Sequence, residues 1–218
     1  MLKICLDGNR GCRFVFSGKI YSMETKEKIT EKELIGKYLR KAKKLIPEYK
    51  VSGSIESGIK KFARYLISGR EGGVRVSGGV GSGKTTFMKI WSEVLRGTDK
   101  YFKIVRCQDI VLEYKEYGDE VIEKYARGIT GVGEVRYMFD DFGDEDIISD
   151  YGVKVNVMRL IIDKKYWYLK NGVSKKYPHF TSNISDKEIC DKYGERISDR
   201  IVEISAMLVL NDKSWRGR

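Results

Sequence analysis

The most informative stretch of this chain reads Gly78-Gly79-Val80-Gly81-Ser82-Gly83-Lys84-Thr85-Thr86, which fits the pattern G-x-x-x-x-G-K-[ST]. Its glycines let the backbone turn tightly enough for successive N–H groups to point at phosphate oxygens. In such a loop the Lys84 side chain reaches the terminal phosphates, and the Thr85 hydroxyl binds Mg²⁺. We therefore expect residues 78–86 to contact a nucleoside triphosphate.

The residues on either side of this loop match the context that a phosphate-binding loop requires. Val74-Arg75-Val76 reads as a short buried strand just before it. After it, apolar residues recur at the spacing of one helical face, namely Phe87, Ile90, Trp91, Val94 and Leu95. The alternative is a glycine-rich turn that happens to precede a lysine, and the order of strand, loop and helix disfavours it.

The composition favours a protein that stays inside the cell and binds a polyanion. The 218 residues include 42 Lys or Arg and 31 Asp or Glu, for a formal charge of +11. This excess favours nucleic acid or a membrane surface as partner, although a basic surface without a specific ligand is the plain alternative. No apolar run approaches the ~20 residues of a membrane span, and no signal peptide is recognisable. Four scattered cysteines without a C-x-x-C pair fit free thiols, so we expect a cytoplasmic location and no membrane.

The chain is expected to divide into an N-terminal extension, residues 1–50, and a core, residues 51–218. Residues 1–30 alternate apolar and polar side chains around a turn at residues 7–11, which predicts a small β-hairpin element. A capping-box pattern at residues 30–33 then begins a helix that ends near Pro47. The polar face of this helix is basic and carries Lys37, Arg40, Lys41, Lys43 and Lys44. It can contact a nucleic-acid backbone or an acidic partner, or it is only solvated.

Strands and helices alternate through the core. The predicted helices are 55–66, the one after the loop, 109–116, 153–169 and one that follows a capping box at 185–188. The predicted strands are 74–76, 103–106, 137–139, 180–182 and 207–210. This alternation predicts an α/β fold in which a parallel sheet carries helices on both faces.

Two adjacent carboxylates follow the apolar strand that precedes them in the chain. Asp140 and Asp141 end this strand, and carboxyl ends of parallel strands are where ligands of such sheets collect. Asp140 is expected to hold Mg²⁺ through water, and Asp141 to orient or deprotonate the attacking water. The alternative is an acidic loop, since residues 144–146 are also acidic.

Further candidate residues follow later strands. Asn183 closes the strand after the aspartate pair and can hold the water or the γ-phosphate from the side, although Ser-Asn after a strand commonly marks a turn. Arg196 and Arg200 lie four residues apart on one helical face, where surface charge is the plain alternative. Arg216 lies close to the C-terminal end of the sequence. By itself it reads as a tail residue.

The order of these motifs resembles the AAA+ ATPases of the DnaC/IstB group. The motifs are GGVGSGKTT, MFDDFGDED, TSNIS, YGERISDRI and KSWR, within about residues 55–218. Within that group the chain is most similar to replicative-helicase loaders, and residues 151–168 resemble loader-like proteins of phages and mobile elements. Two departures are a region before the core without a recognisable helicase-binding motif, and so few residues after Arg216 that a helical lid is expected to be absent or minimal.

The resemblance implies a P-loop NTPase fold of the AAA+, ASCE type, with three α/β/α layers and a five-stranded parallel sheet of order 5-1-4-3-2. It implies Asn183 as the sensor 1 residue and Arg216 as the sensor 2 residue. It also implies Arg200 as an arginine finger that reaches the nucleotide of a neighbouring subunit, with Arg196 beside it. ATP and Mg²⁺ are the implied cofactors.

Four functions are compatible with these residues. The leading one is an ATPase that loads a replicative helicase of the DnaB type, binds single-stranded DNA and self-assembles with ATP. The second is an IstB-like transposition helper that binds duplex DNA and recruits a transposase. A small-molecule kinase is disfavoured because it leaves the spaced arginines and Asn183 unexplained. A module that binds ATP without hydrolysing it is the fourth, since Asp141 stands where many relatives have Glu.

Overall fold

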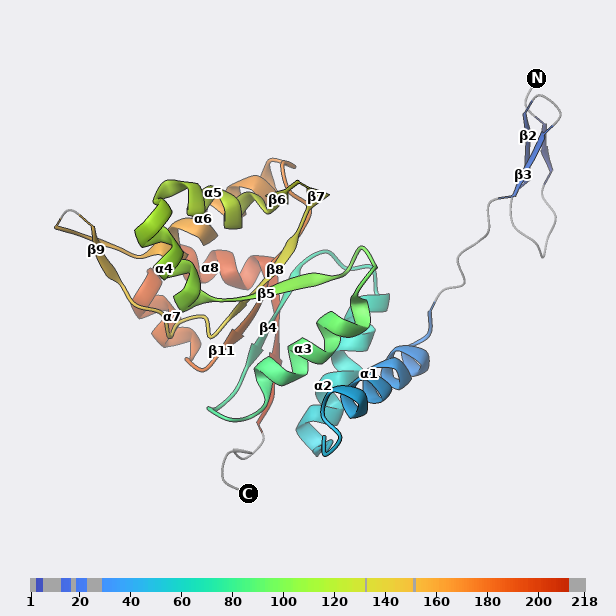
Figure 1. The fold of residues 1–218 in the computed structure, drawn as a ribbon, viewed down its shortest axis with the longest axis horizontal. Helices are drawn as coiled ribbons and strands as arrows, with labels where there is room; N and C mark the ends of the chain where they lie inside the picture. Colours follow the sequence, from blue (N-terminus) through green and yellow to red (C-terminus); the bar gives the residue numbers. More distant parts are fainter. Residues whose placement is uncertain are drawn as a thin grey trace. The chain divides into compact units, whose positions relative to one another are not determined.

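The computed structural model describes residues 3–5, 13–16, 19–22, 29–131, 133–150 and 152–211. It separates the chain into two compact units, Met1–Thr30 and Glu31–Arg218. The first unit contains a three-stranded antiparallel sheet of strands β1 (Lys3–Cys5), β2 (Arg13–Phe16) and β3 (Lys19–Ser22), in the order β1-β2-β3 (Figure 1). The turn expected at residues 7–11 lies outside the described residues.

The basic helix expected in the extension packs on the core unit. Helix α1 (Glu31–Leu45) buries Leu34, Tyr38 and Ala42, and it packs against helices α2 (Gly53–Ile67) and α3 (Lys84–Leu95). The second compact unit therefore begins at Glu31 and not at residue 51, because the apolar face of α1 is part of the same core.

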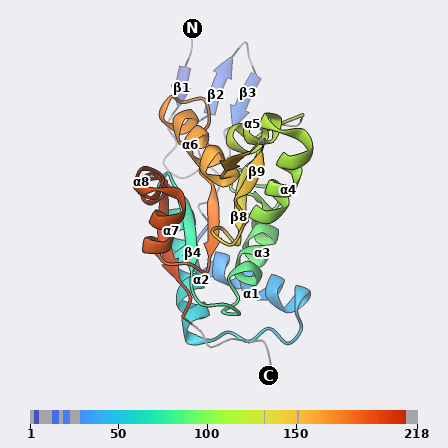
Figure 2. The same ribbon diagram turned by 90° about the vertical axis from the view of Figure 1, so that its left-hand side faces the viewer.

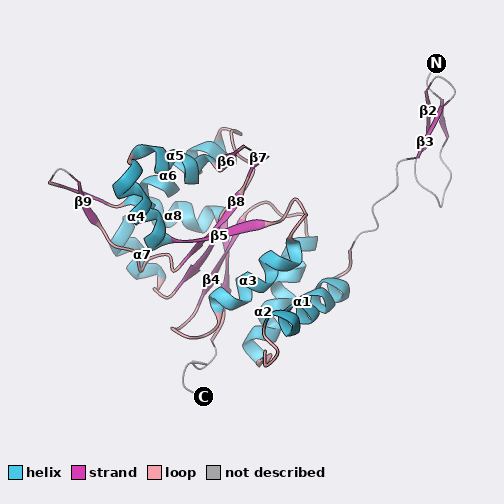
Figure 3. Ribbon diagram, in the orientation of Figure 1, coloured by secondary structure: helices cyan, strands magenta, loops and turns pink. Residues whose placement is uncertain are grey.

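The core unit is built on one parallel sheet of five strands, drawn in magenta in Figure 3. The strands are β4 (Gly73–Ser77), β5 (Phe102–Arg106), β8 (Arg136–Asp140), β11 (His179–Ser182) and β12 (Ser205–Val209). Their order is β12-β4-β11-β8-β5, and each adjacent pair is parallel. Numbered along the chain, this order is 5-1-4-3-2, so the expected topology is confirmed.

Helices cover both faces of this sheet and complete three layers (Figures 1 and 2). Helices α1, α2 and α3 share one apolar cluster with Met138 of β8. A second cluster joins Tyr137 and Phe139 of the same strand to the remaining helices. These helices are α4 (Cys107–Tyr117), α5 (Asp119–Arg127), α6 (Val157–Lys170), α7 (Asp186–Tyr193) and α8 (Glu195–Ile204). Successive strand residues point to opposite faces, which explains how one strand serves both clusters.

The helix predicted at residues 153–169 begins later than expected. Val153–Val155 forms strand β10, which pairs antiparallel with β9 (Ile148–Asp150). Asn156 then caps α6 by accepting a hydrogen bond from the Arg159 backbone N–H at 3.0 Å. The β-branched Val153 and Val155 favour a strand, and Asn is a preferred N-cap residue. Helix α5 and the hairpin of β6 (Ile129–Thr130) and β7 (Gly133–Glu134) were not predicted.

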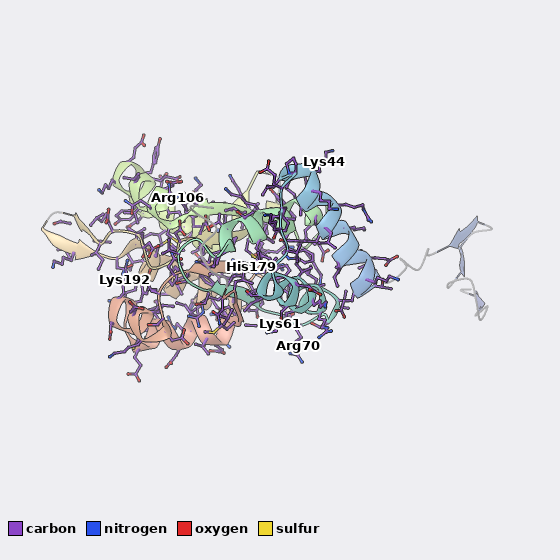
Figure 4. The ribbon with its side chains drawn as sticks, turned by 90° about the horizontal axis from the view of Figure 1, so that it is seen from below. Lys44, Lys61, Arg70, Arg106, His179 and Lys192 are labelled. Carbon is purple, nitrogen blue, oxygen red and sulfur yellow. The ribbon has the colours of Figure 1, made fainter. Side chains whose placement is uncertain are left out.

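A buried histidine joins two of the central strands. His179 of β11 is fully buried, and its Nδ1 accepts a hydrogen bond from the Val74 backbone N–H of β4 at 2.9 Å. Figure 4 shows it in the interior, between peripheral side chains such as Lys44 and Lys192. Accepting at Nδ1 requires the neutral ring, and burial lowers the pKa of His179 well below its usual value.

In the described residues, no helix is long and apolar enough to cross a bilayer.

Candidate nucleotide site

The glycine-rich loop connects the end of β4 to the beginning of α3. Gly78, Gly81 and Gly83 all have positive φ angles, of 156°, 79° and 86°. A Cβ atom on Gly78 would lie 2.1 Å from the Leu210 carbonyl oxygen, so a larger residue cannot occupy this position without moving the backbone. The loop therefore leads into the N-terminus of α3, where free N–H groups and the helix dipole favour an anion.

Lys84 is held inside this loop. Its Nζ donates to the carbonyl oxygens of Gly78 at 2.8 Å and Gly79 at 2.9 Å, and to Oδ1 of Asn183. The Lys84 side chain is buried, with 5% of the residue exposed. The structure thus brings Asn183, which follows β11, into direct contact with the lysine of the loop.

Asp140 is the point where three segments meet. Its Oδ1 accepts from the Thr85 hydroxyl at 2.8 Å and from the Thr181 hydroxyl at 2.6 Å, and the residue is buried. A hydroxyl and a carboxylate are hard oxygen ligands that suit Mg²⁺. Among the described residues no group of three or more His, Cys, Asp or Glu side chains could hold a metal. Mg²⁺ usually binds one or two carboxylates together with substrate phosphates and water.

Asp141 occupies an unusual backbone conformation beside this pair. Its φ of 55° makes it the one described non-glycine residue with a positive φ, a conformation that Asp tolerates better than most side chains. The Asp141 N–H donates to the Thr181 hydroxyl at 3.0 Å, which fixes the turn. Burial, followed by the charges of Asp140 and Asp144, raises the pKa of Asp141. Backbone strain and a perturbed carboxylate together are frequent at functional sites.

Asn183 is oriented by Asp144, one of the acidic residues that follow the aspartate pair. The Asn183 Nδ2 donates to Oδ2 of Asp144 at 2.7 Å, while its Oδ1 accepts from Lys84. Asp144 in turn lies in a turn closed by a hydrogen bond from its N–H to the Asp141 carbonyl at 3.1 Å. Asp144 therefore fixes which end of the amide faces Lys84.

A cavity of about 360 Å³ lies beside the loop. Among its lining residues are Val80, Gly81, Gly83, Lys84, Thr85, Thr86, Asp141 and Asn183. The opposite part of the lining was not predicted and consists of Ile46, Glu48, Tyr49 and Lys50, between α1 and α2, with Ile55 of α2. Tyr49 is tied to α1 by a hydrogen bond of 2.8 Å between its hydroxyl and that of Tyr38. Apolar side chains next to a phosphate loop provide a surface for the base and sugar of a nucleotide.

Arg196 and Arg200 are not among the residues that line this cavity. Arg196 and Arg200 are on α8, which covers the face of the sheet opposite α3, and both contact Asp163 of α6. Arg216 lies outside the described residues. Within one chain, the structure brings together Lys84, Thr85, Asp140, Asp141 and Asn183, and it does not bring the two arginines to them.

The fold is similar to those of solved AAA+ proteins. A crystal structure of the DnaC helicase loader aligns with 17% identity and a TM-score of 0.56, over 76% of this chain and 95% of that one. Domain III of the Thermotoga maritima replication initiation protein DnaA aligns with 16% identity and a TM-score of 0.52, over 74% and 64%. AMPPCP-bound DnaA from Aquifex aeolicus aligns with 14% identity and a TM-score of 0.50, over 74% and 48%.

No protein-family model and no curated sequence matches the chain. The structural likenesses show the fold, which is the P-loop AAA+ fold shared by DnaC and DnaA. The expected fold class is thereby confirmed.

The raised pKa of Asp141 predicts that this residue destabilises the nucleotide-free protein at neutral pH. A carboxyl whose pKa is higher in the folded state opposes folding once the pH exceeds its unfolded value, near 3.8. Asp141→Asn should therefore raise the melting temperature at pH 7, and this gain should shrink as the pH is lowered towards 4. Thermal unfolding of both proteins without nucleotide, at a series of pH values, measures the difference.

Asp99→Asn, at an exposed aspartate outside the cavity, is the matched control and should show no such pH-dependent gain. A constant difference between Asp141→Asn and the original protein across the series would contradict an electrostatic cause.

Proposed function

We propose that the protein is an ATPase that binds ATP and Mg²⁺ in the cavity beside the loop. In this proposal the loop backbone and Lys84 hold the phosphates, and Thr85 and Asp140 hold Mg²⁺, which stabilises developing charge on the phosphates. Asp141 orients or deprotonates the attacking water, and Asn183 fixes it from the side. Ile46, Tyr49 and Ile55 contact the base and sugar.

One observation carries this proposal. Lys84 contacts Asn183 and Thr85 contacts Asp140, so residues separated by 99 and 55 positions in the chain meet at one edge of the sheet. They follow β4, β11 and β8, which are neighbours in the sheet. Carboxyl ends of adjacent parallel strands are the common ligand site of α/β sheets.

We further propose that a second copy of the chain completes the site. The cavity lining contains no arginine among the described residues, whereas phosphoryl-transfer sites commonly use a guanidinium to stabilise transition-state charge. Arg200, with Arg196 beside it, is the proposed donor from a neighbouring copy. Arg216 remains a proposed nucleotide contact within the chain. Contacts of this head-to-tail type build rings or helical filaments.

The proposed role of this ATPase is to load a replicative helicase onto single-stranded DNA. Its support is the likeness to the DnaC helicase loader, which extends over 95% of that protein's chain, together with the net charge of +11. The α1 face is the proposed DNA contact. Lys37, Arg40, Lys43 and Lys44 are exposed on it, and Lys44 projects outwards at the edge of Figure 4. The alternative role as a transposition helper rests on the same core.

Removal of the Lys84 ammonium is expected to weaken ATP binding and to abolish hydrolysis. A hydrogen bond to a charged group contributes about 1.5–3 kcal/mol, so Lys84→Ala should weaken ATP binding by about 10- to 100-fold. Titration with a fluorescent ATP analogue and phosphate release with single-stranded DNA measure the two effects. Lys89→Ala, at an exposed lysine of the same helix, is the control, and equal ATP affinity in both variants would contradict the assignment.

The α1 contact predicts a change in the salt dependence of DNA binding. Each phosphate neutralised on a single strand contributes about 0.7 to the slope of log affinity against log salt concentration. Replacing Lys37, Arg40 and Lys44 together by Gln should therefore reduce the slope by about two. Fluorescence anisotropy with a labelled oligonucleotide over a range of salt concentrations measures it.

The matched control removes the same charge from exposed positions outside α1, at Lys115, Lys175 and Lys187. Equal slopes for the two triple variants would exclude α1 as the DNA contact.

The loader role predicts an association with the cognate replicative helicase that responds to nucleotide. The purified helicase should be retained by the immobilised protein, and the retained amount should change when ATP is replaced by ADP. Lys84→Ala should lose this response. Stronger binding to duplex than to single-stranded DNA, with no helicase retained under either nucleotide, would instead support the transposition-helper role.

A further inference from the structure

Helices α6 and α8 are joined by a row of charged and aromatic side chains. From α6 the row contains Asp163, Tyr166 and Lys170, and from α8 it contains Arg196, Arg200 and Glu203. Lys170 pairs with Glu203, and the Tyr166 hydroxyl donates to Glu203 at 2.6 Å. On each helix these residues are three or four positions apart and therefore share one face.

Asp163 is the anion on which both arginines converge. Its Oδ1 accepts a hydrogen bond from Nη1 of Arg200 and lies 3.4 Å from Nη2 of Arg196. The Arg200 guanidinium also lies over the Tyr166 ring, with its Cζ 4.5 Å from the ring centroid. A planar guanidinium held by a carboxylate at one edge and by an aromatic ring at its face has little freedom to rotate.

The contacts hold Arg200 without using all of its donors. A guanidinium has five N–H donors, and Asp163 is its one hydrogen-bond acceptor among the described residues. The Arg200 side chain is 19% exposed and that of Arg196 is 72% exposed. Both groups therefore remain accessible from outside the subunit, Arg196 more than Arg200.

We propose that Asp163 is a positioning residue for the arginines that act on a neighbouring copy's nucleotide. Its carboxylate, with the Tyr166 ring, fixes the Arg200 guanidinium before the subunits associate and keeps Arg196 beside it. The remaining donors then meet the phosphates without a further loss of side-chain freedom. The inference rests on the proposed function, in which Arg200 and Arg196 are supplied in trans.

The same carboxylate keeps two like charges together on one helical turn. Arg196 and Arg200 are four residues apart on α8, a spacing at which like charges repel. Asp163 lies 43% exposed between them and reduces this repulsion. The negative charge of Asp163 also lowers the attraction of the arginines for phosphate. If Asp163 is a positioning residue, removing its charge slows hydrolysis, whereas if it is a competing anion, removing its charge speeds hydrolysis.

Mixtures of two inactive variants test this inference in the assembled protein. Lys84→Ala is expected to bind ATP weakly and not to hydrolyse it, but it retains its arginines, whereas Arg200→Ala binds ATP but lacks the guanidinium. The proposed function predicts that a mixture hydrolyses ATP, because the first variant supplies Arg200 to the nucleotide of the second. Adding Asp163→Asn to the Lys84→Ala chain should then reduce this activity by about tenfold, by analogy with the loss on removing a residue that orients a metal ligand. Adding it to the Arg200→Ala chain should leave the activity unchanged.

Each outcome separates the inference from the proposed function. A mixture without activity before Asp163 is changed would overturn the composite site and this inference with it. An active mixture that is insensitive to Asp163→Asn, faster with it, or equally reduced from either chain would overturn the inference alone. Glu123→Gln in the Lys84→Ala chain is the matched control. It removes the ion pair between Glu123 of α5 and Lys164, which lies next to Asp163 on α6, and it does not alter a contact with α8.

Discussion

The candidate site depends on a single buried carboxylate. Asp140 is 4% exposed, and an ionised group so far from water is tolerated only with hydrogen-bond donors around it. Thr85 of α3 and Thr181 of β11 supply those donors. The same arrangement joins the helix after the loop, the strand that ends in the aspartate pair and the strand that leads to Asn183. This junction fixes Thr85, Asp141 and Thr181 relative to one another.

The basic side chains with proposed roles lie in three different parts of the core unit. Lys84 is turned inwards and buried in the loop, whereas Arg196 and Arg200 are held on the opposite layer by Asp163. Lys37, Arg40, Lys43 and Lys44 of α1 are exposed in the layer that carries the cavity. The α1 helix also leads directly into Tyr49 and Lys50 of the cavity lining. A strand of DNA on α1 would therefore lie next to the residues proposed to contact the base and sugar of the nucleotide.

The parts of this fold that could be predicted from sequence have strong local signals. The loop pattern, the apolar strands and the capping box at Ser185, which is confirmed, are each encoded by residues that are close together in the sequence. No local sequence pattern identifies residues 46–50 as part of the cavity lining, because only the packing of α1 on the core places them beside the loop. Asp144 and Asp163 likewise read as ordinary acids until the structure gives them partners from other strands and helices. The hairpin before α6 was missed because Val153 and Val155 lie close in sequence to the apolar residues that begin the helix, Val157 and Met158.

The buried His179 makes the stability of the folded protein sensitive to acid but not to base. It is the single histidine of the chain, it is enclosed completely, and it links β11, which leads to Asn183, with β4, which leads to the loop. With its pKa depressed by burial, the ring stays neutral in the native state while the denatured chain takes up a proton below about pH 6.5. Protonation of His179 in the denatured chain thus lowers the stability of the folded protein under mildly acidic conditions, whereas a rise in pH leaves this contribution unchanged.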